Sequence, residues 1–246
     1  MLTLFLLLRT IVFRQYRVFY FFALYLGINL AQTAIGVVLY QGYGFASSTT
    51  YAVAWTTQGL VVVGRAFAAA EVCHLVLGAY KGIWALAARI LSFCGLLVLG
   101  LALYFGRSGY HVGVITLEIG LEASIATGIA GLFLFARYYQ VRIAPQSGWL
   151  ALGLGLFSCF KVLNDLAFER FARAYGIEWN HASMLAFVAA LLVWTWALRD
   201  PLADKVPAPT LKPAHLYANL IPQVNQRLAE LNEHLTRLWN LESPKP

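Results

Sequence analysis

ARILSFCGLLVLGLALYFG, residues 88–106, has no charged side chain between Arg89 and Arg107. A run of this length matches the roughly 20 apolar residues that a helix needs to cross the ~30 Å hydrocarbon core of a bilayer. Long continuous apolar runs are typical of membrane helices. The strands of a membrane barrel are shorter, and apolar and polar residues alternate along them. Similar runs cover residues 18–40, 51–79, 111–136, 149–170 and 181–198. The sequence therefore predicts an all-α, polytopic transmembrane bundle of about six spans.

The overall composition supports a membrane protein. Apolar residues make up 60% of the chain and charged residues only 12%, with a mean hydropathy of +0.68, a balance unusual for a soluble domain. The formal net charge is +7, but the basic residues stand at the ends of apolar runs, so we expect no nucleic-acid partner. The three cysteines lie inside apolar runs without a CxxC pair, and we expect neither a metal nor another cofactor.

The basic residues between the spans predict an orientation. Seven of them fall on one side of the predicted topology: Arg9, Arg14, Arg17, Lys81, Arg89, Arg137 and Arg142. The other side has Arg107, Arg170 and Arg173. Because cytoplasmic loops are enriched in Lys and Arg, this bias predicts a multi-pass protein of a bacterial cell (inner) membrane with both termini in the cytoplasm.

Segments of different character flank the predicted bundle of residues 18–199. Residues 1–17 are apolar and basic, have no signal-peptide cleavage site and are expected to stay attached, at the membrane interface or as an extension of the first span. Residues 200–213 contain four prolines and predict a stiff linker. Residues 214–241 predict an amphipathic or coiled-coil tail helix.

The tail helix has an apolar seam at heptad spacing. The tail seam consists of Ile221, Val224, Leu228, Leu231, Leu235 and Leu238. A seam of this spacing favours pairing with a second copy or with a cytoplasmic protein through residues 219–241. Three heptads are few for a coiled coil, so the alternative is a helix lying against the membrane or against its own bundle.

Charged and polar residues inside the predicted spans form the candidate site. The polar cluster consists of Arg65, Glu118, Glu122, Lys161, Asn164 and Asp165. Charges in hydrocarbon cost several kcal/mol unless they are paired or hydrated, and two bases here face three acids, which leaves one carboxyl group over. Two interpretations remain open: ion pairs that hold three helices together, or a midplane site for a proton, a cation or another ligand.

Two further features of the spans carry expectations. Glu71 and His74 are three residues apart and predict a local hydrogen-bonded pair. Gly120, Ser124 and Gly128 recur every four residues, a ridge of small residues that lets another helix approach closely.

No known catalytic signature occurs, so we expect a non-enzymatic protein. The leading hypothesis is a sensor or assembly module with a buried ion-pair cluster and a cytoplasmic interaction helix. The rival hypothesis is a small-solute or proton/cation-coupled transporter that uses the midplane carboxylates, although the absence of an internal repeat counts against an inverted-repeat transporter. A third alternative is an enzyme acting on lipid, with the carboxyls and His74 as acid and base.

Overall fold

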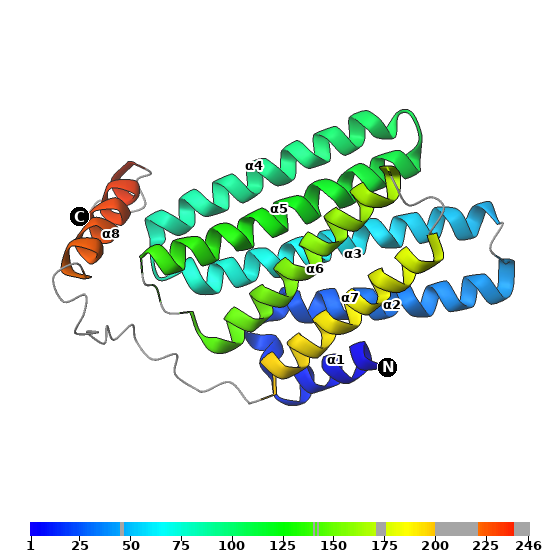
Figure 1. The fold of residues 1–246 in the computed structure, drawn as a ribbon, viewed down its shortest axis with the longest axis horizontal. Coiled ribbons are helices and arrows are strands. Elements are labelled where there is room, and N and C mark those ends of the chain that lie inside the picture. The colour runs from blue at the N-terminus through cyan, green and yellow to red at the C-terminus, as the bar shows by residue number, and fades with distance from the viewer. Residues whose placement is uncertain (45–46, 140, 142, 171–175, 200–220, 239–246) are drawn as a thin grey trace, which may run out of the picture.

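The computed structural model describes residues 1–44, 47–139, 141, 143–170, 176–199 and 221–238, and these form helices and short connections without a strand (Figure 1). The predicted all-α class is confirmed. The helices are α1 (Leu2–Val12), α2 (Tyr20–Tyr43), α3 (Ser48–Leu77), α4 (Lys81–Gly106), α5 (Tyr110–Tyr138), α6 (Pro145–Arg170), α7 (Gly176–Ala197) and α8 (Ile221–Leu238). The predicted linker, residues 200–213, lies outside the described residues.

Five helices are long and apolar enough to cross a membrane: α2, α3, α4, α5 and the Pro145–Asp165 part of α6. They agree with the first five predicted spans and indicate a multi-pass membrane protein. The sixth predicted span corresponds to α7, whose described apolar part, His181–Ala197, is shorter than the others. The structure thus supports five spanning helices, and the sixth stays a prediction.

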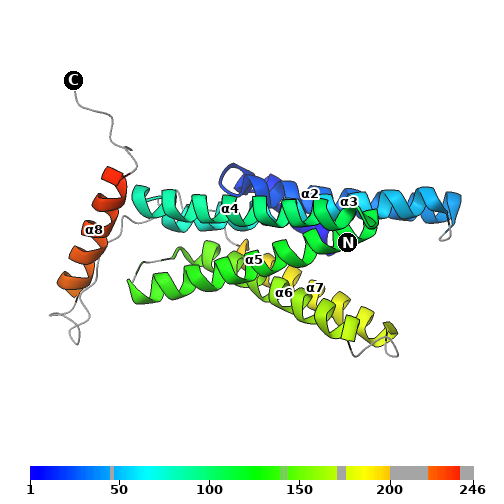
Figure 2. The same cartoon turned by 90° about the horizontal axis from the view of Figure 1, so that it is seen from above.

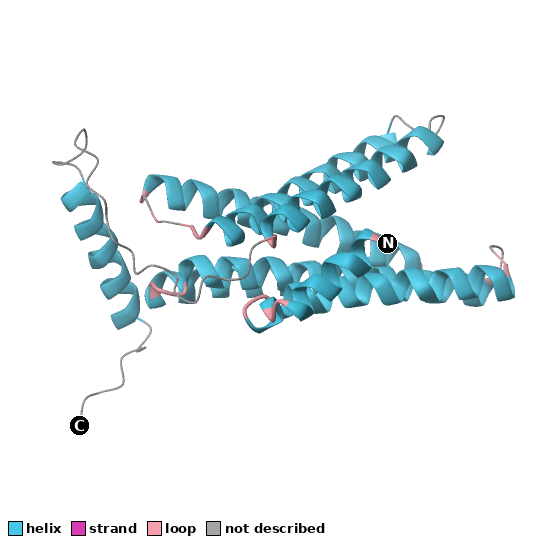
Figure 3. Cartoon of the chain, turned by 90° about the horizontal axis from the view of Figure 1, so that it is seen from below, coloured by secondary structure: helices cyan, strands magenta, loops and turns pink. Residues whose placement is uncertain are grey.

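The long helices form two layers (Figure 2). Helices α2, α3 and α4 lie in one layer, α6 and α7 lie in the other, and α5 packs against α3, α4 and α6. Toward the end of the bundle away from α8, helices α6 and α7 diverge from α2 and α3 (Figure 3). The predicted bundle is therefore a pair of crossing layers joined through α5.

The N-terminal segment forms a separate helix. Arg14 has a left-handed backbone with a φ of 54°, and a 3-10 turn, Gln15–Arg17, follows it, so α1 does not extend α2. Instead α1 packs on the end of α7: Leu6 is fully buried, and the Gln15 side-chain amide donates to the Leu198 carbonyl at 3.2 Å. The outer face of α1 leaves Phe5 and other apolar side chains exposed, as an interfacial helix would.

The largest core cluster joins α2, α3, α6 and α7 around Trp194. This side chain is fully buried, with its ring 5.3 Å from that of Phe22 and 6.0 Å from that of Tyr25, both edge-on. The indole lies directly against Gly153, where an added Cβ would come within 2.4 Å of Trp194 Nε1. Gly153 is therefore the small residue that makes room for this tryptophan on α6.

The ridge of small residues on α5 faces α4, as a close-packing surface should. A Cβ at Gly120 would lie 2.7 Å from Val98 Cγ1, and one at Gly128 would lie 3.7 Å from Leu91 Cδ2. The closest approach to the backbone of α4 is at Gly113, where a Cβ would lie 2.8 Å from the Ala102 carbonyl oxygen. The α4–α5 contact therefore depends on residues without a side chain.

Gly113→Ala is expected to lower the midpoint of thermal unfolding in detergent, because the new methyl group meets backbone atoms of α4 that cannot turn away. Overpacking of this kind lowers the free energy of unfolding by about 1–3 kcal/mol. Gly131→Ala on the same helix is the control: its Cβ meets nothing within 4 Å, so the variant should be as stable as the parent or more so. Equal midpoints for the two variants would show that the α4–α5 contact is looser than described.

Candidate functional site

The most deeply buried part of the polar cluster is an ion pair between α3 and α5. Arg65 donates to Glu122 Oε1, and the two residues are only 3% and 0% exposed. Arg65 Nε also donates to the Tyr25 hydroxyl at 3.3 Å, and the guanidinium carbon lies 4.5 Å from the centre of the Phe157 ring. The pair is thus enclosed by aromatic rings, which adds a cation–π contribution to the charge pairing.

The second part of the polar cluster is built around Lys161 on α6. Its ammonium lies 3.0 Å from Glu118 Oε1 on α5 and 3.5 Å from Asp165 Oδ1, one turn along α6. Asn164 donates to the same Asp165 oxygen at 3.3 Å. One cation is therefore shared between two carboxylates.

The two parts divide the predicted charges unevenly. Arg65 and Glu122 neutralise each other in a buried site, whereas the surplus carboxyl belongs to the group of Glu118, Lys161 and Asp165. The side chains of Lys161 and Asp165 are 19% and 23% exposed. The extra negative charge therefore lies in the part of the polar cluster that the protein does not fully enclose.

Some buried polar atoms of the cluster have no hydrogen-bond partner among the described residues. They are Glu122 Oε2, Asn164 Oδ1 and the neighbouring Ser158 Oγ. An unsatisfied carboxylate oxygen in a buried site costs more than a neutral group. The Arg65–Glu122 site is thus stabilised by one ion pair and by the side chains that surround it, while Glu122 Oε2 can still accept a hydrogen bond.

Two glutamines that the sequence analysis passed over extend the cluster to α2. Gln58 on α3 donates to Glu118 Oε1 at 2.8 Å, and Gln32 on α2 donates to Gln58 Oε1 at 3.0 Å. A continuous line of polar contacts therefore runs from α2 through α3 and α5 to α6. The signal in the sequence is a neutral amide side chain inside an apolar run, as at Asn164.

Glu71 makes contacts beyond the predicted pair with His74. The two Glu71 oxygens accept the backbone N–H groups of Phe21 and Phe22, each at 3.0 Å, at the start of α2. The first N–H groups of a helix have no partner within it, and a carboxylate there is favoured by the helix dipole. The His74 ring packs 4.6 Å from the Trp84 ring, so Glu71 has a structural role.

The tail seam is only partly used for docking. Leu228 and Leu235 are buried against the α3–α4 connection, in a cluster with Val76, Leu77 and Ile83. Leu231 and Leu238 stay exposed at 40% and 61%, and the side chains of Ile221 and Val224 lie outside the described residues. Of the arrangements predicted for the tail, the one seen within this chain is a helix lying against its own bundle.

The contact between α8 and the bundle is specific as well as apolar. The Gly82 backbone N–H donates to Asn232 Oδ1 at 2.9 Å. A Cβ at Gly82 would come 2.5 Å from the Asn232 carbonyl oxygen and 2.9 Å from Leu235 Cβ. Helix α8 therefore sits directly on the first turn of α4.

The described part of the chain holds no group of three or more His, Cys, Asp or Glu side chains arranged for a metal ion. Cys73, Cys94 and Cys159 are free thiols.

Neither a family model, nor a curated protein, nor a solved structure matches the chain.

Arg65→Met and Glu122→Gln are each expected to destabilise the bundle by about 3–5 kcal/mol, because either change leaves a buried partner without its counter-charge. The double variant should lose less stability than the sum of the losses in the two single variants, since both charges are removed together. Thermal or denaturant unfolding of the four proteins in detergent measures the coupling.

The control for this cycle is Glu233→Gln, which breaks the exposed Arg237–Glu233 pair on α8 and should change stability by less than about 1 kcal/mol. Strictly additive losses at Arg65 and Glu122 would mean that the two residues do not stabilise each other.

Proposed function

We propose that the chain is a non-enzymatic sensor or assembly module of a bacterial cell membrane. Its bundle holds the buried ion-pair cluster, and α8 transmits the state of the bundle to a cytoplasmic partner or to a second copy. The supporting observation is that two helices take part in both features. Helix α3 carries Arg65 and also Val76 and Leu77, while α5 carries Glu122 and also Leu132, and these three apolar residues belong to the cluster that includes Leu228 and Leu235 of α8.

The proposal includes six spans, with α7 as the sixth, and places the α8 end in the cytoplasm. Lys81 and Arg137 stand at helix ends on the α8 side, whereas Arg107 stands at the opposite end of α4. The positive-inside rule assigns the more basic end to the cytoplasm. An even number of spans then leaves both termini on that side.

Helix α8 can transmit the state of the bundle only if little free energy is needed to release it from the bundle. Burial of Leu228 and Leu235 is worth about 1.5–3 kcal/mol each, from which the cost of ordering the helix is subtracted. A docking contact made by two leucines is small enough for a partner to shift. Because Leu231 and Leu238 are already exposed, the tail seam offers that partner an apolar surface in the docked state.

A transporter of small solutes or cations is the second candidate. It is favoured by the partial exposure of Lys161 and Asp165 beside Glu118, a charged site between α5 and α6 where the two layers diverge. In that case one carboxylate exchanges a proton or cation during transport. Solute or proton flux into proteoliposomes that is the same for the parent and for Glu118→Gln argues against this function.

Gly82→Ala is expected to release α8, because its methyl group overlaps the Asn232 backbone and the Leu235 side chain. An isolated amphipathic helix owes most of its stability to packing, so backbone amides of residues 221–238 should exchange with deuterium faster in the variant. Hydrogen–deuterium exchange followed by mass spectrometry measures this effect.

The control is Gly100→Ala on the same helix, where a Cβ meets nothing within 4 Å and exchange in α8 should match the parent. If the amides of α8 are as well protected from exchange in Gly82→Ala as in the parent, the proposal that α8 transmits the state of the bundle through this contact is contradicted.

A further inference from the structure

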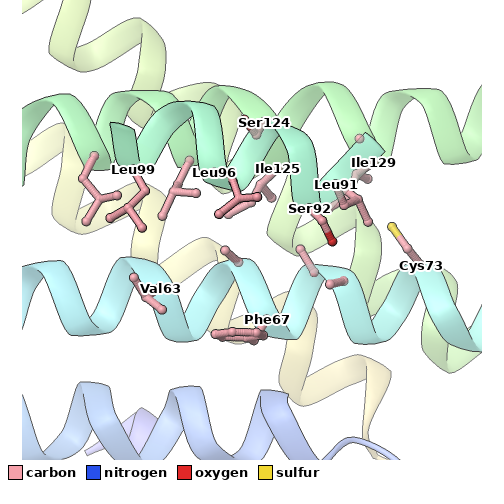
Figure 4. Close-up of a pocket in the computed structure, with 17 residues that line it drawn as sticks. Val63, Phe67, Cys73, Leu91, Ser92, Leu96, Leu99, Ser124, Ile125 and Ile129 are labelled. Carbon is pink, nitrogen blue, oxygen red and sulfur yellow. The ribbon is translucent and has the colours of Figure 1, made fainter. Parts of the chain in front are cut away.

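A cavity of about 520 Å³ lies between α3, α4 and α5, apart from the polar cluster. Figure 4 shows Val63, Phe67 and Cys73 on α3 facing Leu91, Leu96 and Leu99 on α4 across it. Ser124, Ile125 and Ile129 line it from α5. Its volume falls within the range of small-molecule sites, about 300–1,000 Å³.

The lining selects an apolar occupant. Charged side chains do not occur among the described residues that line the cavity, and its polar side chains are Ser92, Ser124 and Cys73. Ser124 already donates to the Gly120 carbonyl at 2.7 Å. An ion or a polar solute would have to give up its hydration there without compensation, whereas a hydrocarbon would lose nothing.

The rim of the cavity faces the lipid side of the bundle. Phe67, Leu96 and Leu99 are 53%, 69% and 45% exposed and belong to helices long and apolar enough to cross a membrane. The floor residues Leu121, Ile125 and Ile129 are buried, at 8%, 5% and 2% exposed. An occupant therefore enters sideways from the bilayer and reaches side chains that lipid at the protein surface does not touch.

The dimensions fit a chain from one leaflet. From Val63 to Cys73 the cavity follows ten residues of α3, which is about 15 Å at 1.5 Å per residue. This is half of the ~30 Å hydrocarbon thickness. We propose that the cavity binds one acyl chain of a bilayer phospholipid, a site that does not depend on the proposed role of α8.

Photocrosslinking in vesicles tests this site. The protein is reconstituted into phosphatidylcholine vesicles containing a phosphatidylcholine with a diazirine in the middle of one acyl chain, and crosslinked residues are mapped by mass spectrometry. Crosslinks at the buried residues Leu121 and Ile125 are expected, in addition to those on exposed side chains. Crosslinks confined to exposed side chains would overturn the proposal.

A matched pair of variants separates the cavity from the protein surface. Gly95 lines the cavity, and a Cβ added there meets nothing within 4 Å, so Gly95→Leu fills the space without a clash at the backbone. Crosslinking at Leu121 and Ile125 should fall about tenfold, as expected for the loss of one well-formed apolar site. Gly100→Leu, on the same helix and equally free of neighbours at its Cβ, should leave it unchanged.

Ser92→Leu fills the cavity from another position on α4 and replaces Gly95→Leu if that variant fails to fold, as judged by helix content and thermal unfolding. Equal crosslinking of the buried residues in the parent and in a folded cavity-filling variant contradicts the assignment. Equal losses in the Gly95 and Gly100 variants would do the same, because they would mark a general effect of α4 substitution.

Discussion

The ion pair between Arg65 and Glu122 is the constraint on which the arrangement of the bundle depends. Two charges removed from water are tolerated only when their geometry is good and their surroundings are complementary. Arg65 meets this requirement with a carboxylate on α5, a hydroxyl on α2 and an aromatic ring on α6. Any large shift of α3 relative to α5 would separate the pair, so the charges fix which faces of these helices meet.

Apolar packing in a membrane cannot supply that specificity alone, because lipid chains are as apolar as the side chains they would replace. In this bundle, small residues determine the packing of some helix pairs and polar contacts determine that of others. Helices α4 and α5 approach each other through Gly113 and Gly120, whereas α2, α3, α5 and α6 are connected by the line of contacts from Gln32 to Lys161. Between α3 and α4, by contrast, a cavity remains.

The fold class and the five long spans could be predicted because uninterrupted apolar runs follow directly from bilayer thickness. The residues of the polar cluster could be found for a related reason, since a charge within such a run stands out. Which acid pairs with which base could not be predicted: the rise per residue gives a depth but not a helix neighbour. The same limit applies to Glu71, which accepts from backbone groups about fifty residues away in the sequence.

The tail and the cavity show two other limits. Heptad spacing indicates an apolar stripe but not which surface covers it. The contact that holds α8 on α4 depends on Gly82, and a residue without a side chain gives no pattern in the sequence from which the contact could be predicted. The cavity has no sequence signature at all, because its lining residues are the ordinary apolar residues of three spans. Both features arise from tertiary packing, and both lie beside the helices that carry the ion pair.

The charge state of Glu122 in a lipid bilayer tests the central claim most directly. Infrared difference spectra between the parent protein and Glu122→Gln, recorded in reconstituted bilayers at neutral pH, report the form of the carboxyl group that is lost. A salt bridge with Arg65 predicts the loss of an ionised carboxylate absorption. Loss of the C=O absorption of a protonated acid would contradict the account, because Arg65 would then lack its counter-charge.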